Sequence, residues 1–72
     1  MFEITFQQNG KSYFLDFRKD EPQAKARCPN HLNKFGGDRT YRIRKEGKPW
    51  LIGRTIAPRV GDERIEWREN YA

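Results

Sequence analysis

The sequence contains one cysteine and one histidine in 72 residues. A single cysteine excludes a disulfide bond within the chain. Cys28 and His31 have the C-x-x-H spacing of half a zinc site, and a second copy of the chain would have to supply the other two ligands. A buried thiol beside an ordinary histidine is the simpler interpretation. We therefore expect no metal and no cofactor.

Long apolar runs are also absent. No stretch has the length of a membrane span, so no membrane contact is expected. The chain starts in a strand pattern at Met1, without the basic and apolar regions of a signal peptide. The lone thiol fits the reducing cytoplasm, which is the expected location.

The motifs of common catalytic sites are missing as well. Gly36 and Gly37 lack the frame of a phosphate-binding loop. No nucleophile, base and orienting group can be assigned together from the sequence. We expect a protein that is not an enzyme.

Length and composition limit the size of the core. Seventy-two residues, of which 35% are hydrophobic and 35% charged, predict one small domain spanning residues 1–72. The chain has ten aromatic residues, from two Trp, three Tyr and five Phe. Aromatic packing or self-association must therefore support the fold, and a homodimer stays open.

The Asn9-Gly10 dipeptide predicts a β-hairpin over residues 2–17. Asn-Gly suits a two-residue turn in which both residues have positive φ. The matching apolar pattern then places the following pairs opposite each other on one face: Phe6 with Tyr13, Ile4 with Leu15, and Phe2 with Phe17.

The second face of this hairpin is polar, and two of its features are unfavourable there: a pair of like charges and a large aromatic side chain. Glu3 is expected opposite Asp16, and such paired carboxylates are more simply explained by exposure or by a neighbouring base than by catalysis. Phe14 is a large aromatic residue on this polar face. It is a possible protein-interface or stacking residue, although we expect a helix or loop to cover it.

A short helix is predicted from about residue 21 to 27. Asp20 is a good N-cap, and Gln23 has the spacing of a capping box. Pro29 disfavours helical geometry at Cys28, so the helix is expected to stop there. Residues 30–35 are candidates for another helical turn before Gly36.

A second hairpin is predicted around Glu46 and Gly47. A two-residue loop pairs Ile43 with Trp50 and Tyr41 with Ile52, and it collects these side chains on one face. A three-residue loop, 45–47, has better turn chemistry but places Arg42 beside Trp50. The apolar alternation, which puts the large side chains on one face, favours the two-residue loop. Pro49 predicts an edge or an irregularity there.

The remaining signals complete an α+β fold. Residues 57–63 have turn signals, and residues 64–68 alternate as a last strand. We predict an antiparallel sheet of about five strands, made of two β-hairpins and a C-terminal strand, with one short helix between the hairpins. The expected core consists of Phe2, Ile4, Phe6, Tyr13, Leu15, Phe17, Ile43, Trp50, Ile52 and Trp67.

Positive charge is concentrated in one part of the chain. The net charge is +5, and residues 39–59 hold seven basic residues against one acidic residue, a local net charge of +6. Such clustering suits an anionic partner, although it also serves as a solvated surface. Arginines at i and i+2 in a strand lie about 6.5–7 Å apart, close to the spacing of successive phosphates. The candidate nucleic-acid-binding residues are Arg39, Arg42, Arg44, Lys45, Lys48 and Arg54.

Two functions are consistent with this charge map. The favoured one is a small non-catalytic binding module that contacts the backbone of DNA or RNA through the basic second hairpin. The alternative is a small inhibitor or adaptor that binds the acidic surface or the sheet edge of a protein, with Phe14 in the interface. Salt dependence distinguishes them, because phosphate binding falls steeply with salt.

Overall fold

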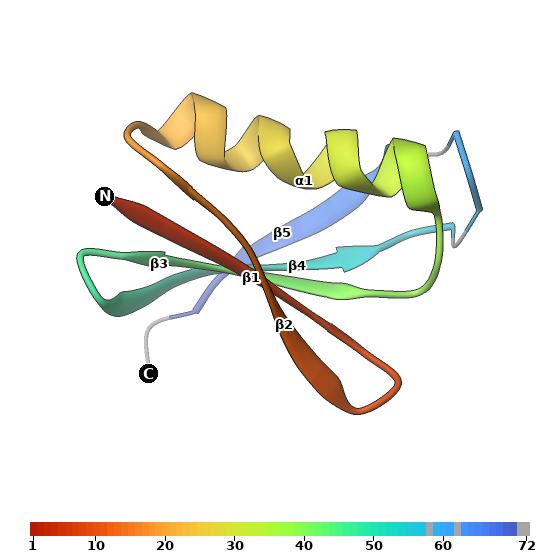
Figure 1. Cartoon of the computed structure of the whole chain (residues 1–72), viewed down its shortest axis with the longest axis horizontal. Coiled ribbons are helices and arrows are strands. Elements are labelled where there is room, and N and C mark those ends of the chain that lie inside the picture. The colour runs from red at the N-terminus through yellow and green to blue at the C-terminus, as the bar shows by residue number, and fades with distance from the viewer. Residues whose placement is uncertain (58, 62, 71–72) are drawn as a thin grey trace.

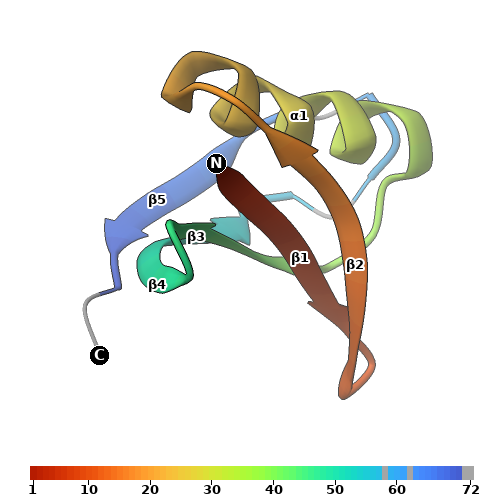
Figure 2. The ribbon, with the colours of Figure 1, turned by 60° about the vertical axis from the view of Figure 1, so that its left-hand side comes forward.

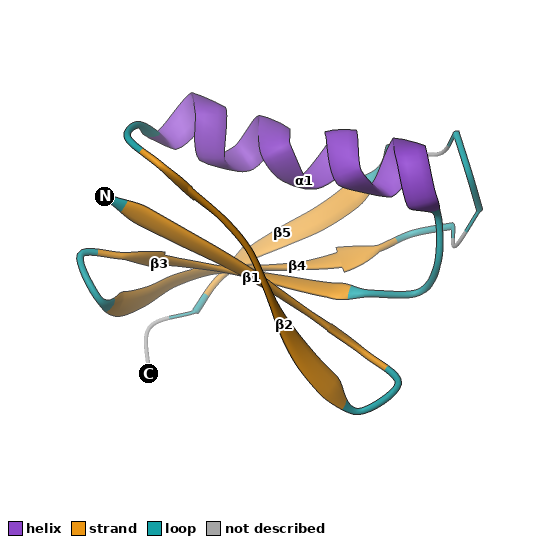
Figure 3. Cartoon of the chain, viewed as in Figure 1, coloured by secondary structure: helices purple, strands orange, loops and turns teal. Residues whose placement is uncertain are grey.

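The computed structural model describes residues 1–57, 59–61 and 63–70, and these form a single antiparallel sheet with one helix. The strand order is β2-β1-β3-β4-β5. The helix α1 lies across one face of the sheet (Figures 1 and 3). The predicted α+β class, with two hairpins, an intervening helix and a last strand, is confirmed. The elements are β1 (Phe2–Gln8), β2 (Lys11–Arg18), α1 (Glu21–Phe35), β3 (Thr40–Lys45), β4 (Lys48–Thr55) and β5 (Ile65–Glu69).

The first hairpin has the predicted turn, with positive φ at Asn9 (54°) and Gly10 (76°). The predicted pairing of Phe6 with Tyr13 is confirmed. Beyond Thr5 the register shifts at a β-bulge, so that Ile4 pairs with Asp16 and Phe2 with Arg18. The predicted pairings of Ile4 with Leu15 and of Phe2 with Phe17 are therefore wrong.

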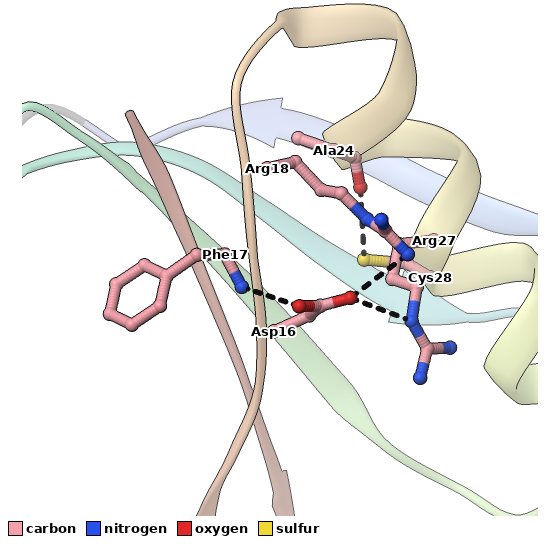
Figure 4. A network of polar contacts seen from close by, with 6 residues as sticks. All are labelled: Asp16, Phe17, Arg18, Ala24, Arg27 and Cys28. Carbon is pink, nitrogen blue, oxygen red and sulfur yellow. Dashed lines mark hydrogen bonds and ion pairs between the residues drawn. The ribbon is translucent and has the colours of Figure 1, made fainter.

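The bulge reverses the direction of the side chains that follow it. The Asp16 carboxylate now points toward α1, where it accepts from Arg27 Nε at 3.2 Å and pairs with Arg18 Nη2 at 2.9 Å. The Phe17 ring points the other way (Figure 4). Glu3 pairs with Phe17, so the expected opposition of two carboxylates is wrong. The ion pairs with Asp16 favour the shifted register.

Gly10 allows a test of the turn itself. An added Cβ at Gly10 would meet nothing within 4 Å, so a larger residue is opposed only by the positive φ. We expect Gly10→Val to lower the free energy of unfolding by about 1–2 kcal/mol. Gly10→Asn is the control, because asparagine tolerates this region. Urea unfolding measures both, and equal losses would contradict a conformational cause.

The helix runs from Glu21 to Phe35 without a break, so the predicted stop before Pro29 is wrong. The predicted N-cap is confirmed, because the Asp20 carboxylate accepts from the Gln23 backbone N–H at 2.9 Å. Gly36, at φ 63°, caps the other end. A proline inside a helix costs about 3 kcal/mol. Burial of one helical stripe against the sheet outweighs that cost, and this stripe consists of Ala24, Cys28, His31 and Leu32.

The second hairpin has the predicted two-residue loop, in which Glu46 (φ 51°) and Gly47 (φ 77°) occupy the left-handed region. A bulge after Pro49 leaves Trp50 outside the ladder. Ile43 therefore pairs with Leu51, and Tyr41 pairs with Gly53, so the predicted partners Trp50 and Ile52 are wrong. As a result, Ile52 pairs with Arg42 on the face away from α1.

The core lies between α1 and the sheet. Three of the ten predicted core residues are buried, and four more pack against the core while partly exposed. Phe17 (51% exposed) and Ile52 leave the core because of the bulges. Tyr13 stacks on Phe6 but is 45% exposed, since it lies near the turn of the first hairpin, and the tip of this hairpin extends away from α1 (Figure 2). The buried residues of the hydrophobic core are Phe2, Ile4, Ala24, Cys28, Leu32, Tyr41, Ile43 and Leu51.

Two further expectations concern the rest of the chain. The loop expected at 57–63 separates β4 from β5, although residues 58 and 62 lie outside the described part. Within the described part, no helix has the length and apolar character needed to cross a membrane.

Candidate functional site

The central strand β3 presents arginines on the face of the sheet opposite α1. Tyr41 and Ile43 are buried in the core beneath the helix, at 0% and 1% exposure. Arg42 and Arg44 alternate with them, so their side chains project from the other side. Strand alternation thus places these two guanidinium groups where α1 does not cover them.

Cross-strand pairing defines the residues that share this surface, which we call the open face. The row through Arg44 consists of Phe17, Glu3, Arg44 and Pro49. The row through Arg42 consists of Phe14, Thr5, Arg42, Ile52 and Arg68. The third row consists of Ser12, Gln7, Thr40, Arg54 and Glu66.

The six basic residues predicted from the sequence divide into two groups. Arg42, Arg44 and Arg54 lie together on the open face. The structure places the other three elsewhere.

Arg39, Lys45 and Lys48 belong to the side of the sheet that α1 covers. Arg39 is 9% exposed, and its guanidinium carbon lies 5.6 Å from the centroid of the Phe6 ring. Lys45 Nζ lies 3.5 Å from the Glu21 carboxylate on α1. Lys48 pairs with Lys45 at the end of the hairpin. These three side chains therefore do not extend the arginine surface.

Neither Arg42 nor Arg44 forms an ion pair within the described part of the chain. Arg42 Nη1 donates to Gln7 Oε1 at 2.9 Å, and Arg44 Nη2 donates to the Gly47 carbonyl at 2.6 Å. Both acceptors are uncharged. The ion pairs among the described residues involve other bases: the N-terminus with Glu46, Arg18 and Arg27 with Asp16, and Lys45 with Glu21.

A shallow hollow marks the centre of the open face. It has a volume of about 360 Å³, and its lining includes Glu3, Thr5, Arg42, Arg44 and Pro49. With four arginines and two glutamates in its rows, the open face has a net charge of +2. The surface therefore offers anionic groups two guanidinium forks, that of Arg42 toward Gln7 and that of Arg44 toward the turn at Gly47.

Two exposed phenylalanines border this surface on the edge strand β2. Phe14 is 57% exposed and Phe17 is 51% exposed. Their ring centroids are 4.9 Å apart, with the ring planes at 51°. The expectation that a helix or loop covers Phe14 is wrong, because α1 packs on the opposite face. An aromatic pair of this kind is an unusual feature of a solvated sheet surface.

Sequence reasoning missed two residues of the open face. Arg68 pairs with Ile52, and its alternation with Trp67 in the predicted last strand was a usable signal. Phe17 reaches this face only because of the bulge, for which the sequence has no local signal.

Cys28 and His31 lie in the core, away from the open face. Cys28 is fully buried, its thiol lies 3.8 Å from the Ala24 carbonyl, and burial raises its pKa to about 12. The thiolate needed for nucleophilic attack is therefore disfavoured. His31 Nδ1 lies 2.9 Å from the Tyr41 hydroxyl. Among the described residues, no group of three or more His, Cys, Asp or Glu side chains could hold a metal ion.

His31 makes the stability of the fold sensitive to acid. Burial, with the nearby charges of Arg39 and Arg27, lowers its pKa from 6.5 to about 4. Between these values the unfolded chain binds a proton that the folded protein excludes, so the free energy of unfolding falls as the pH falls. We expect the free energy of unfolding to fall by about 2–3 kcal/mol between pH 6.5 and about 4 because of this histidine.

The variant His31→Gln isolates that contribution, because its amide can still bond the Tyr41 hydroxyl but does not titrate. Urea unfolding at several pH values should show a flatter profile between pH 6.5 and 4 than for the wild type. Identical slopes in the two proteins would contradict the assignment to His31.

Comparison with known proteins shows no relative for this chain. No protein-family model matches it, and neither the curated proteins nor the solved structures include a significant match. The function must therefore be inferred from the geometry of the open face.

Proposed function

We propose that this protein is a small non-catalytic module that binds the nucleic-acid backbone through the arginines of its open face. The observation that supports this most strongly is the placement of Arg42 and Arg44. They lie two residues apart on the central strand and face away from α1, and within the described part of the chain they bond uncharged acceptors. Phosphate oxygens are strong partners for such guanidinium forks.

The spacing along β3 agrees with this proposal. The pairing of β3 with β1 is regular from Thr40 to Lys45, so the Cα atoms of Arg42 and Arg44 keep the strand separation of about 6.5–7 Å. Arg54 and Arg68 extend the positive surface onto β4 and β5. The proposed interface thus lies across the strands rather than at the tip of the basic hairpin. The buried Cys28 thiol fits a reducing cytoplasm as the location.

A titration with short DNA and RNA oligonucleotides tests the proposal. Fluorescence anisotropy of labelled strands would be measured between about 50 and 200 mM salt, where phosphate contacts weaken strongly. We expect binding that becomes weaker as salt increases, for all sequences alike. If the wild-type protein does not bind either nucleic acid at low salt, the proposal is wrong.

Single alanine variants identify the contacts. Arg42→Ala and Arg44→Ala should each weaken binding to all sequences about equally, and each should reduce the salt slope by ~1 because one phosphate contact is lost. Lys25→Ala on the exposed side of α1 is the matched control, and it should leave the slope unchanged. An unchanged slope in both arginine variants would contradict these contacts.

A protein partner is the second candidate. The strand β2 is an edge of the sheet, and it carries the exposed rings of Phe14 and Phe17. An edge strand can pair with a strand of another protein, and aromatic residues often anchor such interfaces. On this hypothesis, the module acts as an inhibitor or adaptor, and removing Phe14 weakens binding more than removing Arg42 or Arg44.

A further inference from the structure

We propose that the open face selects single-stranded nucleic acid, with unpaired bases stacked on the Phe14–Phe17 pair and phosphates held by Arg42 and Arg44. This inference depends on the proposed function and adds the class of nucleic acid to it. The ligand is the chemistry shared by single-stranded DNA and RNA, namely unpaired bases on a phosphate backbone.

The aromatic pair provides the first part of the argument. Both rings are more than half exposed, and they project from the same face of the sheet as the two arginines. Exposed rings on a sheet surface are stacking platforms for bases, and such stacking strengthens single-strand binding for any sequence. In a duplex the base faces are occupied by neighbouring pairs, so rings on a sheet surface cannot reach them.

The order of side chains across the strands provides the second part. In each of the two rows concerned, an aromatic residue on β2 and an arginine on β3 lie on either side of β1. The aromatic residue and the arginine are therefore two strand spacings apart, about 10 Å between their backbones. Glu3 on β1 lies between Phe17 and Arg44, and its carboxylate repels phosphate from the middle of that row. A ligand with bases on one side and phosphates on the other matches this arrangement.

The position of α1 provides the third part. The helix packs on the opposite face (Figure 2), so the open face has no described helix that could enter a major groove. Reading a duplex usually requires a helix or a two-stranded ribbon inserted into the groove, and the strands of the open face all belong to one five-stranded sheet. A broad sheet surface with rings and arginines is better suited to an extended strand.

Abasic oligonucleotides provide the sharpest test, because they keep the phosphates and lack the bases. Four labelled probes of equal length would be compared by fluorescence anisotropy at low salt: single-stranded DNA, single-stranded RNA, an abasic strand and a duplex. We expect the wild-type protein to bind the base-bearing strands at least about tenfold more tightly than the abasic strand. The duplex should bind more weakly than the base-bearing single strands.

The double variant Phe14→Leu with Phe17→Leu keeps apolar side chains but removes both flat rings. It should bind the base-bearing strands only as tightly as the abasic strand, and its affinity for the abasic strand should be unchanged. Phe35→Leu is the matched control, since Phe35 is a 56% exposed ring on α1. It should not change binding to any probe. Circular dichroism would confirm that each variant is folded.

The outcomes separate this inference from the proposed function. Equal wild-type affinity for base-bearing and abasic strands would overturn the stacking inference while backbone binding stands. A duplex bound as tightly as a single strand would also overturn it. If no probe binds at low salt, both proposals fail, and the aromatic pair is better explained by a protein partner.

Discussion

Replacing Gly53 with valine is expected to lower the free energy of unfolding by about 3 kcal/mol, the upper end of the usual cost of overpacking. Gly53 is buried in β4 opposite Trp67. An added Cβ would lie 2.6 Å from Ile65 Cγ2 and 2.7 Å from Trp67 Cε3 and Cζ3. These separations are too short for carbon atoms, so the Ile65 side chain and the larger, less easily displaced Trp67 ring would both have to move from their positions against the core.

Urea unfolding followed by circular dichroism measures this loss, with Gly53→Ala as a milder step in the same direction. The matched control is the same pair of substitutions in a Trp67→Leu background. There the ring is absent, so Gly53→Val should cost clearly less. An equal cost in both backgrounds would show that the indole ring is not the obstacle.

Local turn chemistry explains which parts of the fold could be predicted. Asn9-Gly10 and Glu46-Gly47 both form the two-residue loops expected from the sequence. The apolar alternation near each turn then sets the pairing, as for Phe6 with Tyr13. These predictions succeeded because the residues that determine them are close together in the chain.

The two bulges could not be predicted, because their causes lie elsewhere in the fold. The first turns Asp16 toward Arg27 on α1, eleven positions away along the chain. The second follows Pro49, where only an irregularity could be expected and not its direction. The helix α1 continues past Pro29 for a similar reason. Burial of Cys28 and Leu32 against the sheet outweighs the local preference of the residue before a proline for non-helical geometry.

The same division applies to the open face. The alternation of Arg42 and Arg44 with Tyr41 and Ile43 is visible in the sequence, and the structure places both arginines on one side. Lys45 is also part of the basic run, but its pairing with Glu21 depends on where the helix packs. Charge counted along the chain therefore overestimated the size of the surface.

Reversing the charge of both central arginines should have the largest effect on binding. In the variant Arg42→Glu with Arg44→Glu, two charge-assisted contacts to phosphate are lost. Each is worth at least about 1.5 kcal/mol. We expect an affinity for nucleic acid at least about 100-fold lower than that of the wild type. Fluorescence anisotropy at about 0.1 M salt would measure it, with circular dichroism to confirm folding because Arg44→Glu places a second acid opposite Glu3.

The control must change net charge equally at another place. Lys19→Glu with Lys25→Glu alters two exposed bases, one just before α1 and one on it, and brings the net charge from +5 to +1 as the arginine variant does. Its effect on binding should be small, since at about 0.1 M salt charges are screened beyond about 10 Å. Equal losses in the two variants would mean that binding follows total charge and that the open face is not the site. A large loss confined to the arginine variant would mean that binding depends on where the charge lies, as expected if phosphate contacts Arg42 and Arg44 directly.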